Sequence, residues 1–208
     1  MKLFKTVVVV LIFLVNLLVA QPSWAETKFT ENPDYIAVTQ TIDSLLQQQQ
    51  TEGVTPENVQ KIADLRFQKY LLERGKDWGQ CRNETGKTLV VYGRKRKQSN
   101  STYDNALYFL PSGQKTDDGW DCDGVYLSSD EKVAGLESVN GQEPRGAVVY
   151  KIVDGTQLLA KTNPVTSEIE FNISPAQVFH AGDQINWFIP DTLQAALNAG
   201  IANAPLDD

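Results

Sequence analysis

The sequence predicts an α+β protein: an N-terminal helical hairpin packed on a small, mostly antiparallel β-sandwich or open barrel, with a short C-terminal helix. Two observations support this fold class. Before residue 72, apolar residues recur at three- and four-residue steps, as in helices that cover a core. From residue 81 onward, short β-rich runs are separated by turn residues with no helix between them, which favours antiparallel pairing. We expect a removed signal peptide at 1–25, the helical hairpin at 26–76 and the β-rich part at 77–208.

The first 25 residues have the features of an export signal. Lys2 and Lys5 give a positive start, and the run 7–20 is almost wholly apolar. Ser23 and Ala25 supply the small residues of a cleavage site. The run is short for a hydrocarbon core of about 30 Å, so a cleaved signal is the prediction and a retained anchor the alternative. We expect export to a periplasm, a thylakoid lumen or the extracellular medium, and no membrane span in the mature chain.

Two consecutive helices are predicted before residue 76. Asn32-Pro33 and Thr55-Pro56 each place an N-cap residue before a proline at the first helical position. The first apolar stripe predicts a helix over about 33–50, and the second predicts a helix that ends at Gly75. Because the connection is short, the two helices should pack antiparallel. The stripes consist of Tyr35, Val38, Ile42 and Leu45, and of Val59, Ile62, Ala63, Phe67, Tyr70 and Leu71.

Strand-like runs follow, with turn signals such as Asn140-Gly141 between them. Asp154-Gly155 lies between two such runs and predicts a β-hairpin. Asp191 is expected to cap a final helix over 192–198. The apolar residues around Trp187 do not alternate, which predicts a strand covered on both faces, with the helical hairpin on one of them. The candidate strands are 88–92, 103–110, 125–127, 147–153, 157–160, 168–173 and 185–189.

Cys81 and Cys122 are the only cysteines, and an even number in an exported chain predicts a disulfide. Closing a loop of about 42 residues would stabilise the fold by roughly 4 kcal/mol. Trp78 and Trp120 lie just before the two cysteines. We expect both indoles to pack around the disulfide, and the alternative is an aromatic platform for a sugar or a peptide.

The formal net charge of −7 argues against binding to nucleic acid or to an anionic membrane surface. One run has the opposite sign: Arg94, Lys95, Arg96 and Lys97, between two candidate strands. Such a run is either a solvated hairpin tip that keeps an edge strand from pairing or the electrostatic part of a surface for an acidic protein partner. We take these four residues as the candidate binding residues. The sequence does not predict an oligomeric state.

An acidic, glycine-containing loop contains Asp117, Asp118, Asp121 and Asp123. Carboxylates at this density are candidate ligands for a hard cation such as Ca²⁺. The pattern departs from an EF-hand, because Gly119 stands in place of the first carboxylate and Asp130 in place of the final glutamate. The alternative is an acidic loop tethered by the disulfide. Ca²⁺ bound by these four aspartates is thus the one candidate cofactor, and otherwise none is expected.

Motifs for nucleophilic or zinc-dependent catalysis do not occur in the sequence. His180 is the only histidine, and it lacks an activated serine or a zinc-ligand set. We expect it in a surface turn before the last strand, although with Asp183 it could act as a lone acid or base. We therefore expect an exported, non-catalytic binding or accessory protein that acts through a protein-binding surface, and favour a non-enzyme. The alternative is a small exported hydrolase that uses the aspartate-rich loop, with a bound divalent cation.

Overall fold

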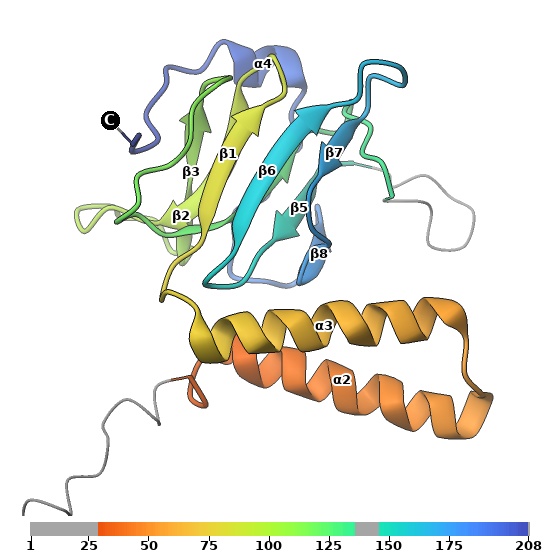
Figure 1. The fold of residues 1–208 in the computed structure, drawn as a ribbon. Coiled ribbons are helices and arrows are strands. Elements are labelled where there is room, and N and C mark those ends of the chain that lie inside the picture. The colour runs from red at the N-terminus through yellow and green to blue at the C-terminus, as the bar shows by residue number, and fades with distance from the viewer. Residues whose placement is uncertain (1–28, 136–145, 208) are drawn as a thin grey trace, which may run out of the picture.

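The computed structural model describes residues 29–135 and 146–207, and it has the predicted α+β architecture (Figure 1). A helix pair lies below two sheets that face each other, and a short helix lies near the C-terminus. The described strands form two open sheets rather than a closed barrel. The signal peptide and the Asn140-Gly141 turn lie outside the described residues.

Both predicted helices are present, and both begin as the sequence indicates. Helix α2 (Pro33–Glu52) follows Asn32, whose side chain accepts a hydrogen bond of 2.8 Å from the Asp34 N–H. Helix α3 (Pro56–Arg74) follows Thr55, whose Oγ1 accepts one of 3.2 Å from the Asn58 N–H. Each cap satisfies a backbone donor that the first helical turn leaves free.

The helix pair packs against one end of the sandwich (Figure 1). Val38 and Ile42 of α2 and Leu65 of α3 are buried in one cluster with Val153, which follows the fifth strand. This cluster is separate from the core between the sheets. None of the helices in the described part of the chain combines the length and apolar character needed to cross a membrane.

The two sheets differ in size and are joined by several crossings of the chain. The smaller has the order β1-β6-β7, and the larger has the order β3-β2-β4-β5-β8. β1 and β6 pair in parallel, and all other neighbouring strands pair antiparallel. The strands are β1 (Gln80–Glu84), β2 (Leu89–Arg94), β3 (Asn105–Leu110), β4 (Cys122–Leu127), β5 (Val148–Lys151), β6 (Gln157–Thr162), β7 (Ile169–Phe171) and β8 (Gln177–His180).

The hairpin prediction at Asp154-Gly155 is wrong. The residues do form a turn, with Gly155 at φ 79°, but the turn carries the chain from β5 in the larger sheet to β6 in the smaller one. Asp-Gly preferences reflect the backbone angles of a tight turn, and they do not determine whether the flanking strands pair.

The predicted strand at 185–189 is also wrong. This segment is irregular and covers the outer face of the larger sheet. Trp187 lies there against Tyr92, with ring centroids 4.8 Å apart, and against Phe179 at 5.8 Å. The apolar residues do not alternate because the segment is irregular and covers the sheet as a separate layer. The helical hairpin packs in a different hydrophobic cluster and does not cover this segment.

The last helix, α4 (Gln194–Asn198), is shorter than predicted and is not capped by Asp191. Leu193 occupies the N-cap position and makes no side-chain capping bond. The Gln194 N–H instead donates to Asp130 Oδ1 at 2.9 Å. A carboxylate from a distant loop therefore fulfils the role that the sequence assigns to a neighbouring residue.

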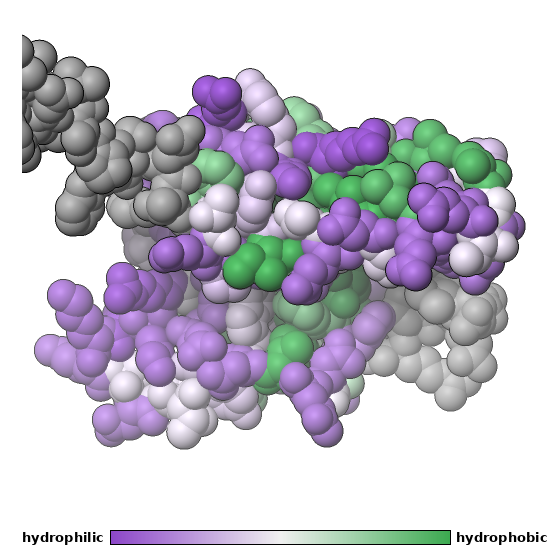
Figure 2. All heavy atoms as spheres, turned by 90° about the horizontal axis from the view of Figure 1, so that it is seen from below, coloured by the Kyte–Doolittle hydropathy of each residue, from purple (hydrophilic) through white to green (hydrophobic). Residues whose placement is uncertain are grey.

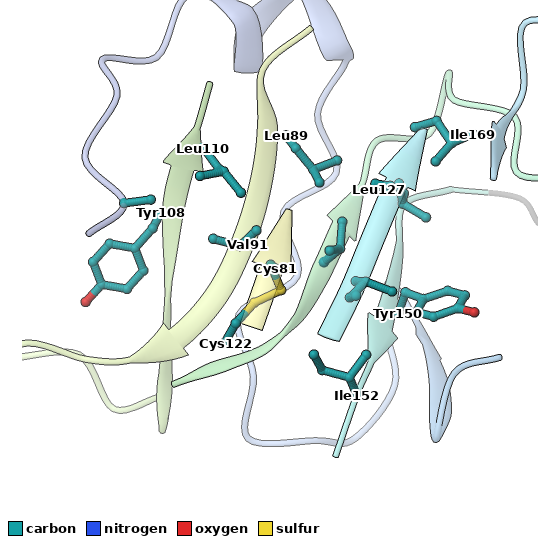
Figure 3. Packing of buried hydrophobic residues seen from close by; sticks show 14 of the residues in the cluster. Cys81, Leu89, Val91, Tyr108, Leu110, Cys122, Leu127, Tyr150, Ile152 and Ile169 are labelled. Atoms are coloured by element: carbon teal, nitrogen blue, oxygen red, sulfur yellow. A yellow bond between two sulfur atoms is a disulfide. The ribbon is translucent and has the colours of Figure 1, made fainter. Parts of the chain in front are cut away.

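The predicted disulfide links the two sheets. Cys81 of β1 and Cys122 of β4 are bonded, with their Cα atoms 5.9 Å apart, inside the core shown in Figure 3. Trp120 packs against this core and lies edge-on to Tyr108 at 5.1 Å, as expected. Trp78 instead lies half-buried in a surface groove, beneath the ammonium group of Lys76 at 4.8 Å.

Trp120 can pack in this way only because residue 93 is glycine. The β2–β4 pairing shifts register between Tyr92 and Gly93, and a Cβ on Gly93 would lie 2.1 Å from the Trp120 ring. We expect Gly93→Ala to lower the free energy of unfolding by about 2 kcal/mol, through overpacking of the core. Urea denaturation measures this loss. Gly119→Ala is the control, because its Cβ would meet only Asp117 Oδ1, at 3.1 Å; equal stability of the two variants would contradict the expectation.

Candidate functional site

The four candidate binding residues form the basic tip: Arg94, Lys95, Arg96 and Lys97, in the connection between β2 and β3. Arg94 ends β2, and its carbonyl accepts a 2.8 Å hydrogen bond from the Tyr108 hydroxyl. The Ser99 N–H donates to the Arg96 carbonyl at 2.9 Å and closes the turn. The connection extends beyond the body of the sandwich (Figure 1). Two hydrogen bonds thus hold the backbone at Arg94 and Arg96, while three of the four cationic side chains are exposed.

The charge of the basic tip is not neutralised locally. Among the residues that the structure describes, no carboxylate forms an ion pair with any of these four side chains. Lys95 is half-buried, and its Nζ donates to the Ser101 carbonyl at 3.1 Å. The full chain has a net charge of −7, so the basic tip is a local reversal of its overall charge.

The aspartate-rich loop does not bring its four carboxylates together. Asp117 accepts a hydrogen bond from the Gly119 N–H at 2.7 Å. Asp118 accepts from Gln80 at 2.5 Å and from Lys115 at 3.3 Å, and these bonds lower the pKa of its carboxyl. Within residues 29–135 and 146–207, no three acidic, histidine or cysteine side chains are arranged to hold a metal ion. The geometry therefore lends no support to Ca²⁺ binding, which stays a prediction.

The other two aspartates of the loop belong to a cluster that the sequence did not indicate. We name it the Lys151 cluster: Lys151, Asp34, Asp121, Asp123 and Asp154. Lys151 forms an ion pair with Asp34. The members come from α2, the start of β4, the end of β5 and the turn after β5. The cluster therefore lies where the helix pair meets the sandwich.

Burial dominates the electrostatics of this cluster. It raises the pKa of Asp123 to about 7, and the charge of Asp121 acts in the same direction, while Lys151 and a hydrogen bond from Asn105 act against it. Burial also raises the pKa of Asp154 to about 6, although Asn32 donates a hydrogen bond to it at 3.1 Å. A general acid must hold its proton near neutral pH, and a raised carboxyl pKa allows this.

A small cavity lies beside this cluster. Asp34 and Lys151 line a cavity of only about 10 Å³, which is about the space of one water. None of the cavities described here is lined by Asp121 or Asp123. The cluster thus joins the helix pair to the sandwich through an ion pair between Asp34 and Lys151.

His180 ends β8 rather than preceding a strand, so the turn prediction is wrong for this residue. The Asp183 carboxylate accepts a 2.7 Å hydrogen bond from the His180 backbone N–H. Asp183 therefore closes a turn after β8. The structure shows no bond in which it orients the imidazole as a catalytic carboxylate would.

A groove between α3 and the smaller sheet is a further candidate site. It consists of two adjoining hollows of about 280 Å³ and 430 Å³, which share Phe67, Leu71, Thr156 and Ile173. Phe67 is 56 % exposed. Figure 2 shows that the helical face also carries hydrophobic patches among its hydrophilic residues, with the larger ones toward the α2–α3 connection. The sequence does not reveal the groove, because its two walls are about 100 residues apart in the chain.

Gln68, on the wall of the first hollow, has an unsatisfied acceptor. The residue is 7 % exposed, and its Nε2 donates to the Pro175 carbonyl in a long bond of 3.4 Å. Its Oε1 is buried without a hydrogen-bond partner. An unmet buried acceptor costs about 1–3 kcal/mol. In the described part of the chain, Thr39 Oγ1 is the other such atom, and Thr39 lines none of these hollows.

Comparison with known proteins gives no match to a family model, to a curated protein or to a solved structure. The surfaces of the chain itself are therefore the basis for inferring a function.

Proposed function

We propose that the protein is an exported, non-catalytic binding or accessory protein, and that it acts through a protein-binding surface with the basic tip as its electrostatic part. One observation carries the proposal. Adjacent cations lie on a hydrogen-bonded loop of an acidic chain, without an ion pair to any carboxylate in the described residues. Charges held in this way attract a partner of opposite sign and speed its association.

The compartment is part of the same proposal. The disulfide between Cys81 and Cys122 agrees with an oxidising compartment. Together with the N-terminal features of the sequence, it supports export to a periplasm, a thylakoid lumen or the extracellular medium. The partner that we expect is a protein with an acidic face in that compartment.

Charge reversal at the basic tip tests this assignment. We expect Arg96→Glu combined with Lys97→Glu to slow association with the partner about tenfold or more at low salt, because the steering field is lost. The same change should flatten the dependence of the association rate on salt. The partner is first recovered with the tagged protein from the native exported fraction and identified. Association rates are then measured with purified components over a range of salt concentrations.

The matched control is Lys61→Glu combined with Arg66→Glu. These cations are exposed on α3, outside the basic tip, and their reversal changes the net charge equally. The control should keep most of the association rate. If both double variants slow association equally, net charge rather than the basic tip is responsible; if neither does, the assignment is wrong.

A further inference from the structure

We propose that the groove between α3 and the smaller sheet binds an extended peptide segment of a partner protein, one that carries a large apolar side chain with a carboxylate a few residues away. The inference rests on the proposed function, because it takes the ligand to be a protein. It adds a second contact, distinct from the basic tip, that recognises particular side chains of the partner.

The size of the groove fits a short extended segment. Asp64 lines only the first hollow, and Lys76 lines only the second. The ten residue steps of α3 from Asp64 to Arg74 span about 15 Å, at 1.5 Å per step. Four or five residues of an extended chain cover about the same distance, at roughly 3.3 Å each.

The middle of the groove is apolar. Phe67 and Leu71 are one helical turn apart on α3, and Ile173 lines the opposite wall in both hollows. Phe67 exposes 56 % of its surface although it lines a concavity. A partner side chain that entered here would remove apolar surface on both sides from water, which is how anchor residues dominate binding.

The unsatisfied acceptor of Gln68 gives the groove a polar preference. Its Oε1 lacks a partner in the free protein, and the residue lines the first hollow. The atom is covered by protein in the free structure, so a donor in the groove would reach it only if the amide group rotated and gave up its long bond to the Pro175 carbonyl. A backbone N–H of a peptide is a donor that a purely apolar ligand lacks.

The two ends of the groove differ in charge, and this orders the ligand. Lys76 forms no ion pair with a carboxylate of the described residues. Asp118 lines the same hollow and its pKa is lowered in part by the charge of Lys76, but its ion pair is with Lys115, which also pairs with Asp207. Asp64, at the other end, likewise forms no ion pair with a described cation. A carboxylate of the ligand therefore belongs at the Lys76 end.

The position of Lys76 also selects among ligand classes. Its ammonium group lies over the ring of Trp78, 4.8 Å from the centroid. One face of the indole is thus occupied by a cation, which disfavours a sugar stacked on that face and favours an anionic group beside it. A peptide carboxylate meets both conditions.

The experiment uses a displayed library of random linear peptides, panned on the purified protein and counter-selected on Phe67→Ala. We expect enrichment of sequences with a large apolar residue and an Asp or Glu within a few residues of it, on a constant side. The best peptide is synthesised with a fluorophore, and its dissociation constant is measured by fluorescence anisotropy. No enrichment over the counter-selection variant would overturn the proposal, as would a preference for peptides without a carboxylate.

Single substitutions then locate the binding. Phe67→Ala should lower the affinity for the peptide at least about tenfold, whereas Tyr70→Ala should leave it unchanged. Tyr70 is an aromatic residue of the same helix with the same 56 % exposure, but it does not line either hollow. Lys76→Glu should likewise weaken binding and Lys61→Glu should not. Equal effects of Phe67→Ala and Tyr70→Ala would place the peptide elsewhere.

Gln68→Met separates binding from stability. Methionine has a similar length and no acceptor that must be satisfied, so the melting temperature should be retained or rise while the peptide binds more weakly. Unchanged peptide affinity would show that Gln68 does not belong to the binding site.

Charge reversal at the basic tip should leave peptide affinity unchanged. If the peptide binds in the groove and charge reversal at the basic tip does not slow association with the partner protein, the proposed role of the tip is wrong and the proposed role of the groove stands.

Discussion

Replacing Cys81 and Cys122 with alanine should lower the free energy of unfolding by about 4 kcal/mol. The cysteines are 41 residues apart in the sequence and are buried in the core. Between them lie β2 and β3, so the bond closes a long loop in the unfolded chain and reduces its entropy. The bond also joins β1 of the smaller sheet to β4 of the larger one. Its loss therefore removes a covalent link between the two layers.

Urea denaturation followed by tryptophan fluorescence measures this effect. The slope of the transition should increase in the double variant, because its unfolded state is more expanded, and the wild type under reducing conditions should behave as the variant does. Val91→Ala is the control: Val91 is buried in the same cluster, and its truncation should lower stability while leaving the slope unchanged. If the midpoint of the double variant equals that of the wild type, the disulfide does not stabilise the fold.

Local signals allowed the helices to be predicted, but not all of the strands. The caps at Asn32 and Thr55 act between neighbouring residues, and the sequence shows both partners. β1 (Gln80–Glu84) has no apolar alternation, because its inward residues are Cys81 and Asn83. Asn83 is buried with its amide satisfied, because it donates to the nearby Lys87 carbonyl and to the Leu110 carbonyl, which tertiary structure supplies. Such a strand cannot be recognised from hydrophobic period alone.

The candidate sites also differ in whether their residues are adjacent in the sequence. The basic tip was predicted because its charges are adjacent in the sequence. The Lys151 cluster was not, because Asp34, Asp123 and Asp154 come together only when the helix pair reaches the sandwich. Likewise, Phe67 and Ile173 face each other across the groove only after folding. Sites made of residues distant in the sequence leave no spacing that a motif search can detect.

The free energy of unfolding should fall as the pH rises from about 4 to about 7, because carboxyl groups of the Lys151 cluster have raised pKa values. Burial raises the pKa of Asp123 to about 7 and that of Asp154 to about 6, against 3.8 as the ordinary value. Burial also raises the pKa of Asp121. The unfolded chain loses these protons first. Across this window the folded state therefore holds more protons, and each step up in pH favours unfolding.

Other groups act in the opposite direction at lower pH. Hydrogen bonds lower the pKa of Asp118, chiefly from Gln80, and that of Asp130, chiefly from Gln194. Their contribution is present above the ordinary carboxyl pKa and is lost as the pH falls through their lowered values. Both side chains are exposed, so this contribution is small. We therefore expect maximal stability near pH 4 to 5, at about the ordinary carboxyl range.

Asp123→Asn tests the cause of this pH dependence. The amide oxygen can still accept the hydrogen bond from Asn105, but the ionisation is gone. At about pH 8 the variant should be more stable than the wild type, by an amount on the order of 3 kcal/mol, and at about pH 4 the two should be nearly equal. Urea denaturation at several pH values across this range gives the dependence of the unfolding free energy on pH for the wild type and for the variant.

Lys151→Met should have the opposite effect. Lys151 lowers the pKa values of Asp121 and Asp123 and pairs with Asp34, so without it the carboxyl groups ionise at greater cost. The decline of stability with rising pH should become steeper, and the loss at about pH 8 should exceed that at about pH 4. Parallel pH profiles for the wild type and both variants would show that the cluster does not titrate in this range, and that the helix pair meets the sandwich without a pH-dependent contribution from it.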